Sequence, residues 1–180
     1  SIKSKILDQG GWLKSVDVRG YEVVLSAEFG FQEHGASFVS DTSVAYTMDV
    51  GSQDALVIQE FSFDKEKKKL RFGKKEKYIF KGLREMQYPV AINENEVAVV
   101  GRDDGVFAEL FVVNIRDRSV RKLTSAQRTY RSLTYSKAHN LLITSVENGK
   151  TGSYDLAAYD LVRGTFFLLT ETPENEFYAV

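Results

Sequence analysis

Apolar runs and turn residues alternate regularly over residues 141–170. A first run rich in β-branched residues ends at an Asn-Gly turn, and the second run after it ends in Tyr-Asp. The turn Val162-Arg163-Gly164 then leads to a third run that closes on Leu-Thr. Short runs of this kind, bounded by Gly, Asn and Asp, are typical of strands joined by tight turns. The pattern predicts a three-stranded antiparallel meander.

Residues 97–124 repeat this pattern. The closing threonines, Thr124 and Thr170, are 46 positions apart, and the leading apolar residues, Val97 and Leu141, are 44 apart. A repeat of this length, in a sequence built from short strands, is what β-propeller blades show. The predicted fold class is therefore all-β, a β-propeller of four-stranded antiparallel blades.

The earlier part of the chain fits the same repeat. We expect a second strand over residues 43–49, a third over 56–64, and two outer runs, 70–72 and 78–80, separated by charged residues. Asp64, Asn114 and Asp160 all fall at the end of a third strand. A short side chain there can accept hydrogen bonds from the backbone amides just beyond it.

Each copy is preceded by a short run suited to the innermost strand of a blade. These runs are residues 37–39, 88–92, 132–135 and 177–180, with Phe38, Tyr88, Tyr135 and Phe177 recurring once in each. We expect these aromatic rings, together with Trp12, to pack between blades. Residues 12–18 and 21–25 read as the last two strands of a further blade. No stretch of the chain carries a helical periodicity.

The runs of the form "apolar strand, Asp or Asn turn, strand ending in Leu-Thr" resemble the blades of TolB-like propellers, which also occur in tricorn-type and prolyl-oligopeptidase-type propeller domains. The Ser-Pro-Asp-Gly turn usual in that family is missing here. Residues 136–140 stand in its place in the last copy, and residues 93–96 stand there in the copy before. Counting the repeat units gives about four blades, in a single β-propeller domain or propeller segment over residues 1–180.

The predicted units lie near residues 37–80, 88–124 and 132–170, with a fourth made of residues 1–26 plus 177–180. If the last strand completes the first blade, the ring closes with four blades and leaves no open sheet edge. The other interpretation is an arc of a larger propeller. Its open blade edges could then lead to self-association.

Composition removes several kinds of chemistry. The chain has 180 residues, no cysteine, two histidines and a formal net charge of −1. Disulfides, thiolate catalysis and Cys-ligated metal are excluded, and a zinc site is disfavoured, so we expect no metal and no cofactor. The near-neutral charge disfavours nucleic acid as the main partner. No apolar run is long enough to span a membrane. Because the chain begins with serine, the localisation stays open.

Motifs that could carry catalysis are better explained as turns. The Gly-Lys-Thr of residues 149–151 lacks the first glycine of a phosphate-binding loop and precedes a strand. Asp103 and Asp104, followed by glycine, read as a hairpin turn and supply too few ligands for calcium. Neither His34 nor His139 belongs to a recognisable triad. We therefore predict no catalytic residue and lean against an enzyme.

Seven lysines and one arginine gather between residues 65 and 77. Such a cluster could meet the phosphates of RNA, DNA or lipid. We interpret it as a solvated outer hairpin whose lysines prevent edge-to-edge pairing. The nucleic-acid alternative would use Lys67, Lys68, Lys69, Lys74, Lys75 and Lys77.

A partner of a propeller is expected to meet one face of the disc. That face is made by the loops between blades and by those between second and third strands, here residues 26–35, 50–54, 82–87, 102–107, 125–131 and 147–153. The candidate binding residues on them are His34, Arg84, Arg102, Asp103, Phe107, Arg128, Tyr130 and Arg131. The predicted function is a non-catalytic module that binds a protein partner or an adjacent domain of its parent chain. The alternatives are a propeller accessory to a peptidase or hydrolase, and nucleic-acid binding.

Overall fold

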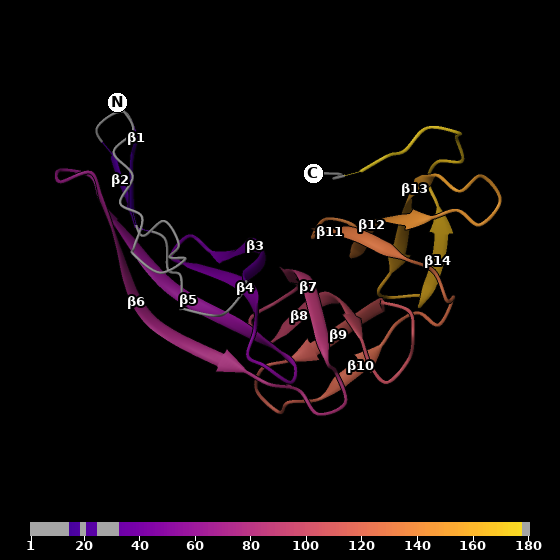
Figure 1. The fold of residues 1–180 in the computed structure, drawn as a ribbon, viewed down its shortest axis with the longest axis horizontal. Helices are drawn as coiled ribbons and strands as arrows, with labels where there is room; N and C mark the ends of the chain where they lie inside the picture. The colour runs from indigo at the N-terminus through magenta and orange to yellow at the C-terminus, as the bar shows by residue number, and fades with distance from the viewer. Residues whose placement is uncertain (1–14, 19–20, 25–32, 178–180) are drawn as a thin grey trace.

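The computed structural model describes residues 15–18, 21–24 and 33–177, and every helix or strand assigned in these ranges is a β-strand (Figure 1). Three four-stranded units follow one another along the chain, and we call them blades 1, 2 and 3. Blade 1 consists of β3 (Glu33–Ser40), β4 (Ser43–Asp49), β5 (Asp54–Asp64) and β6 (Lys69–Tyr78). Blade 2 consists of β7 (Glu85–Ala91), β8 (Glu96–Arg102), β9 (Glu109–Asn114) and β10 (Val120–Lys122). Blade 3 consists of β11 (Tyr130–Ser136), β12 (Leu141–Glu147), β13 (Tyr154–Asp160) and β14 (Thr165–Leu168).

Successive strands of each blade pair antiparallel, and the first strand of each blade lies on the inner side of an arc (Figure 1). The middle one of these inner strands, β7, contacts both β3 and β11. This arrangement confirms the predicted fold class. The chain forms part of a β-propeller.

The strands β1 (Ser15–Val18) and β2 (Tyr21–Val24) form a hairpin that joins blade 1. A parallel pair between Glu22 and Lys69 places β2 beside β6. We had expected these strands in a separate blade, so their place at the outer edge of blade 1 differs from the prediction. Residues 178–180 and 1–14 lie outside the described residues, and closure into a fourth blade therefore stays a prediction.

The two faces of blade 2 contribute side chains to two different hydrophobic cores. Val97 and Val99 of β8 belong to the core between blades 1 and 2, whereas Ala98 and Val100 belong to the core between blades 2 and 3. A strand covered on both faces reads as a continuous apolar run, which explains the absence of alternation in its sequence. The largest fully buried side chain is Phe80, in the first of these cores.

One left-handed residue interrupts the ladder of each inner strand. Gly35 in β3, Tyr88 in β7 and Ser132 in β11 have φ of 56°, 51° and 57°, and each lies at a shift in register. A side chain at Gly35 would meet the backbone of the next bulge, because an added Cβ would lie 3.3 Å from Tyr88 N. The inner strands therefore bend and touch at equivalent places, as β-bulges allow.

The predicted turn residues at the ends of the third strands are confirmed. Asn114 Oδ1 accepts hydrogen bonds from the amides of Arg116 (2.9 Å) and Asp117 (3.2 Å). The carboxylates of Asp160 and Asp64 accept from amides two or three residues ahead in the same way. The bond from the Arg163 amide is the main cause of the lowered pKa of Asp160.

Some strand boundaries differ from the prediction. The outer strand β6 runs without a break through the charged residues that were expected to divide it. A bulge at Gly73 and Lys74 accommodates them, because the Gln59 side chain donates to both bulged carbonyls and Glu60 Oε2 accepts from the Lys74 amide at 3.2 Å. Elsewhere the inner strands start earlier than expected, at Glu33, Glu85 and Tyr130.

Candidate interaction face

The strand order brings one set of loops to the same end of all three blades. At this end, the second strand leads into the third, and the fourth strand leads to the next blade; we call it the loop face. Its segments are residues 50–53, 79–84, 103–108, 123–129, 148–153 and 169–176. All eight candidate binding residues lie in these segments or in strand residues at this end.

Four of these candidates are strand residues and not loop residues: Arg102 ends β8, Arg131 belongs to β11, and the other two are His34 and Tyr130. His34 belongs to β3, where it pairs with Thr47, because β3 begins two residues before the expected end of the loop. Tyr130 begins β11 and is only 3% exposed, so the expectation of a surface tyrosine is wrong. Its ring packs edge-to-face against Phe166, with centroids 6.1 Å apart, in the core between blades 2 and 3.

Burial raises the pKa of Tyr130 to about 12. Its hydroxyl lies near Thr124 and Glu109 but has no well-formed hydrogen bond. A buried polar group without a partner lowers stability. Tyr130 is thus a core residue whose hydroxyl group lowers the stability of the fold.

We expect Tyr130→Phe to leave the free energy of unfolding at pH 7 unchanged or to raise it by up to about 1 kcal/mol. The folded pKa lies above the usual value of about 10, so the stability linked to this group is fully present below pH 10 and is lost as the pH rises to about 12. Urea unfolding across this range should show a smaller loss of stability in the variant.

The control is Tyr135→Phe, which removes a hydroxyl that donates to Asn140 Oδ1 at 2.8 Å. This variant should be less stable by about 0.5–1.5 kcal/mol. A clear destabilisation by Tyr130→Phe, together with an unchanged alkaline loss, would contradict the assignment.

Three candidate residues take part in ion pairs along blade 2. Arg84 contacts Asp104 at 2.9 Å, and Arg102 pairs with Glu85. Asp103 accepts a hydrogen bond from the Lys122 ammonium at 2.8 Å, and this bond is the main cause of its lowered pKa. Exposed pairs of this kind contribute little to stability. Here, these pairs neutralise charged side chains on this part of the loop face.

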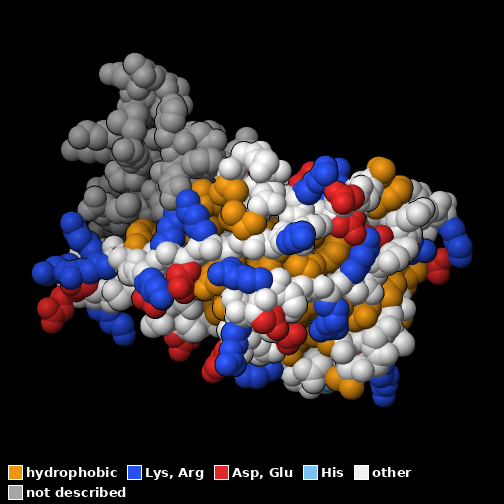
Figure 2. All heavy atoms as spheres, turned by 90° about the horizontal axis from the view of Figure 1, so that it is seen from below, with side chains coloured by type: hydrophobic (Ala, Val, Ile, Leu, Met, Phe, Trp, Pro, Cys, Tyr) orange, Lys and Arg blue, Asp and Glu red, His pale blue; other side chains and the backbone are white. Residues whose placement is uncertain are grey.

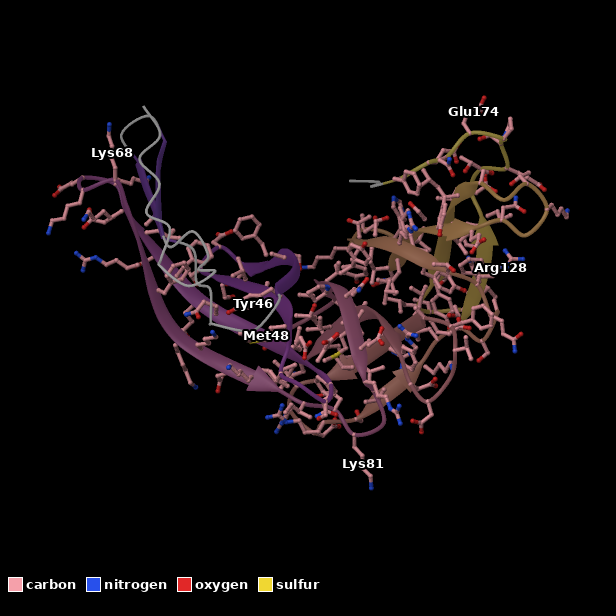
Figure 3. The ribbon with its side chains drawn as sticks, viewed as in Figure 1. Tyr46, Met48, Lys68, Lys81, Arg128 and Glu174 are labelled. Carbon is pink, nitrogen blue, oxygen red and sulfur yellow. The ribbon has the colours of Figure 1, made fainter. Side chains whose placement is uncertain are left out.

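Beside these pairs, the loop between β8 and β9 exposes two apolar side chains. Val106 is 80% exposed and Phe107 is 41% exposed. Arg128, in the segment between blades 2 and 3, is half-buried and lies beside blade 3 (Figure 3). A polar hollow of ≈ 420 Å³ lies between the β4–β5 loop and the start of β7. The loop face therefore offers apolar, cationic and acidic groups close together.

An arginine stacks on two aromatic rings at the blade 3 end of the loop face. The Arg131 guanidinium carbon lies 4.6 Å from the Tyr154 ring centroid and 6.0 Å from that of Phe177. The two rings are 5.2 Å apart with an interplanar angle of 44°. Arg131 and Phe177 are exposed and Tyr154 is half-buried. We call these three residues the Arg131 cluster.

The sequence interpretation had only part of this cluster. Arg131 was a candidate, but Tyr154 was not. Phe177 was expected to pack between blades, and the structure shows it 39% exposed against Tyr154. Phe38 is likewise 73% exposed, whereas Tyr88 and Tyr135 pack against the core between blades 2 and 3, as expected.

A buried acid at the start of each third strand also escaped the sequence interpretation. Asp54, Glu109 and Asp155 are each at most 9% exposed. Each carboxylate accepts a hydrogen bond from a backbone amide that lies beyond the last strand of its own blade. These amides belong to Met86 (2.8 Å), Gln127 (2.9 Å) and Thr172 (3.0 Å). The signal that could have found them is the 46-residue spacing of Glu109 and Asp155, the same as that of Thr124 and Thr170.

The two later acids are accompanied by the closing threonines of the repeat. Thr124 Oγ1 donates to Glu109 at 2.5 Å and accepts from the Leu110 amide at 3.0 Å. Thr170 Oγ1 accepts from the Leu156 amide at 2.9 Å. These acids and threonines thus hold the segments of the loop face against the ends of the strands.

The lysine hairpin lies at the opposite end of blade 1, with Lys68 at its tip (Figure 3). Lys74 pairs with Glu76 at 2.9 Å, and this hydrogen bond raises the pKa of Lys74 and lowers that of Glu76. Lys75 lies 6.0 Å from the Tyr46 ring centroid. Figure 2 shows Asp and Glu side chains interspersed among the Lys and Arg side chains of one face.

Within the residues that the structure describes, no three His, Cys, Asp or Glu side chains are arranged to hold a metal ion. In the same part of the chain, no helix is long and apolar enough to cross a membrane.

Comparisons with known proteins support the fold. Neither protein-family models nor curated proteins give a match to this sequence. Among solved structures, the chain is similar to TolB from Acinetobacter baumannii, with a TM-score of 0.56 and 18% sequence identity. The match covers 78% of this chain but only 32% of the TolB chain, so this chain spans about a third of that protein's length. The chain is therefore an all-β partial propeller with the fold of a TolB-like structure.

Proposed function

We propose that this chain is a non-catalytic propeller module that binds a protein partner, or a neighbouring domain of its parent chain, through the loop face. We further propose that its blades are of the type shared by TolB-like, tricorn-type and prolyl-oligopeptidase-type propellers. The observation that carries the binding proposal is the Arg131 cluster. Arginine and aromatic residues are enriched where protein interfaces derive most of their affinity.

Stacking prepares these side chains for binding. An arginine loses considerable side-chain freedom when a partner immobilises it, and this loss weakens association. The rings of Tyr154 and Phe177 already restrict Arg131 in the free protein. The backbone of Tyr154 is held as well, because its carbonyl accepts from the Glu176 amide at 2.7 Å. A partner would thus meet a pre-organised contact.

The remainder of the loop face supplies the surroundings of such a contact. Val106 and Phe107 offer exposed apolar surface, and the ion pairs of Arg84 and Arg102 offer a polar rim. An apolar or aromatic centre with a polar rim is the usual anatomy of a protein interface. The lysine hairpin supports nucleic-acid binding less well, because Lys74 is paired with Glu76 and Lys75 lies over Tyr46.

Selection from a library of random peptides displayed on phage tests this proposal. We expect the wild-type protein to enrich a family of peptides. The double variant Arg131→Ala/Phe177→Ala should bind the enriched peptides at least tenfold more weakly, because it removes the centre of the contact. Binding would be measured by fluorescence anisotropy with the selected peptides.

The matched control is Val162→Ser, which removes a side chain that is 77% exposed in the turn at the other end of blade 3. This variant should bind the peptides as the wild type does. Failure to enrich any peptide, or peptides whose affinity responds to Val162→Ser and not to the double variant, would contradict binding through the loop face.

A further inference from the structure

Two acids beside the Arg131 cluster, Glu176 and Asp155, are engaged by other donors. Both carboxylate oxygens of Glu176 accept hydrogen bonds from hydroxyls, one from Thr170 and one from Thr172 at 3.0 Å. Asp155 is fully buried and accepts from the Thr172 amide at 3.0 Å. Among the described residues, none forms an ion pair with Arg131.

The neighbouring arginine is in the same situation. Arg128 forms no ion pair within the part of the chain that the structure describes, whereas Arg84 and Arg102 of blade 2 each contact a carboxylate. Within the described residues, two arginines three positions apart, at the boundary between blades 2 and 3, therefore have no ion pair, although the chain as a whole has a net charge of −1.

Arg131 is exposed, and contact with an aromatic ring is compatible with hydrogen bonding by the same guanidinium group. A guanidinium group is flat, and its five N–H groups point outward in the plane of the ring-like fork. The Arg131 guanidinium carbon lies 4.6 Å from the Tyr154 ring centroid and 6.0 Å from that of Phe177, and a cation at such a distance is attracted to the face of the ring. The planar edge can then form two parallel hydrogen bonds to one carboxylate, which is the arrangement that arginine favours.

We propose that the Arg131 cluster is a carboxylate-binding site that accepts the side chain of an Asp or Glu, or the terminal carboxylate, of an acidic peptide segment. This inference rests on the proposed function and names the chemistry of the partner. A carboxylate fits better than a phosphate, because two acids lie beside the cluster: Glu147 is paired with Tyr154 in the sheet, and the Glu176 amide donates to the Tyr154 carbonyl. Their negative charges disfavour a doubly charged ligand more than a singly charged one.

Two display libraries test this inference. They are identical except that Asp and Glu at the randomised positions of the first are replaced by Asn and Gln in the second. We expect the wild-type protein to enrich peptides from the acidic library only. The best acidic peptide should bind Arg131→Gln at least tenfold more weakly, and Arg131→Lys should fall between the two, because lysine keeps the charge but not the planar fork.

The matched control is Arg118→Gln. Arg118 is also exposed and also stacked, with its guanidinium carbon 4.3 Å from the Tyr78 ring centroid, but it lies in the β9–β10 turn. This variant should bind the acidic peptide within twofold of the wild type. Thermal unfolding followed by circular dichroism verifies that all variants are folded.

The outcomes separate the two proposals. Enrichment of neutral peptides that lose binding in Arg131→Gln would overturn the carboxylate inference and leave the interaction module intact. Tighter binding of the same peptide with phosphoserine in place of glutamate would overturn it in favour of a phosphate site. No enrichment from either library would overturn both proposals.

Discussion

Phe80→Ala is expected to lower the free energy of unfolding by about 3–5 kcal/mol, the largest effect we predict for a single substitution. Phe80 has no exposed surface and lies between blades 1 and 2. Replacement of the ring by a methyl group leaves a cavity lined by apolar side chains and also weakens the contact between two blades. Urea unfolding followed by circular dichroism would measure the loss.

A milder variant keeps this prediction measurable if Phe80→Ala does not fold. Phe80→Leu keeps most of the volume and should cost about 1–2 kcal/mol. The adjacent Ile79 is 50% exposed, and Ile79→Ala should change stability by less than about 1 kcal/mol. Equal effects of Phe80→Ala and Ile79→Ala would contradict a core at the boundary between these blades.

Glu109→Ala is expected to lower the free energy of unfolding by about 2–4 kcal/mol. The carboxylate accepts from Thr124 Oγ1 at 2.5 Å and from the Gln127 amide at 2.9 Å, and its residue is 3% exposed. Alanine would leave both donors without a partner in a buried place, which costs more than the hydrogen bonds themselves contribute. The segment from blade 2 to blade 3 would then lose its attachment.

Hydrogen exchange distinguishes this mechanism from a general loss of stability. The Gln127 amide should exchange much faster in Glu109→Ala than in the wild type. The exchange rates of core amides in blade 1 should change only as much as the change in global stability requires. Glu94→Ala removes an exposed acid of blade 2 and should change stability by less than about 0.5 kcal/mol. An unchanged exchange rate at Gln127 would show that Glu109 does not hold this segment.

The repeat was predictable from sequence because its signals are local. The second strand of blade 1 has the bounds that the comparison with the repeat predicts, and the Asx turns at Asn114 and Asp160 follow from short side chains placed after apolar runs. The continuity of β6 was missed because it depends on Gln59 and Glu60 from the strand beside it. A charged stretch looks like the end of a strand in the sequence, because the sequence does not show which residues of the neighbouring strand bond to its backbone.

The candidate site was less predictable for the same reason. Arg131 was selected by residue type and loop position, but its stacking partners lie 23 and 46 positions further along the chain. Tyr130, its immediate neighbour, points into the core because successive side chains of a strand face opposite sides. Residue type alone does not separate these two positions.

The division of β8 between two cores has a consequence for how the molecule comes apart. Detachment of blade 1 exposes Val97 and Val99 to water, and detachment of blade 3 exposes Ala98 and Val100. Unfolding of blade 2 therefore breaks both contacts between blades at once. Among the three described blades, blade 2 is the one that packs against a described blade on each side, so its opening should cost more free energy than the opening of a single contact. Blade 2 should thus persist when one of these two contacts is broken.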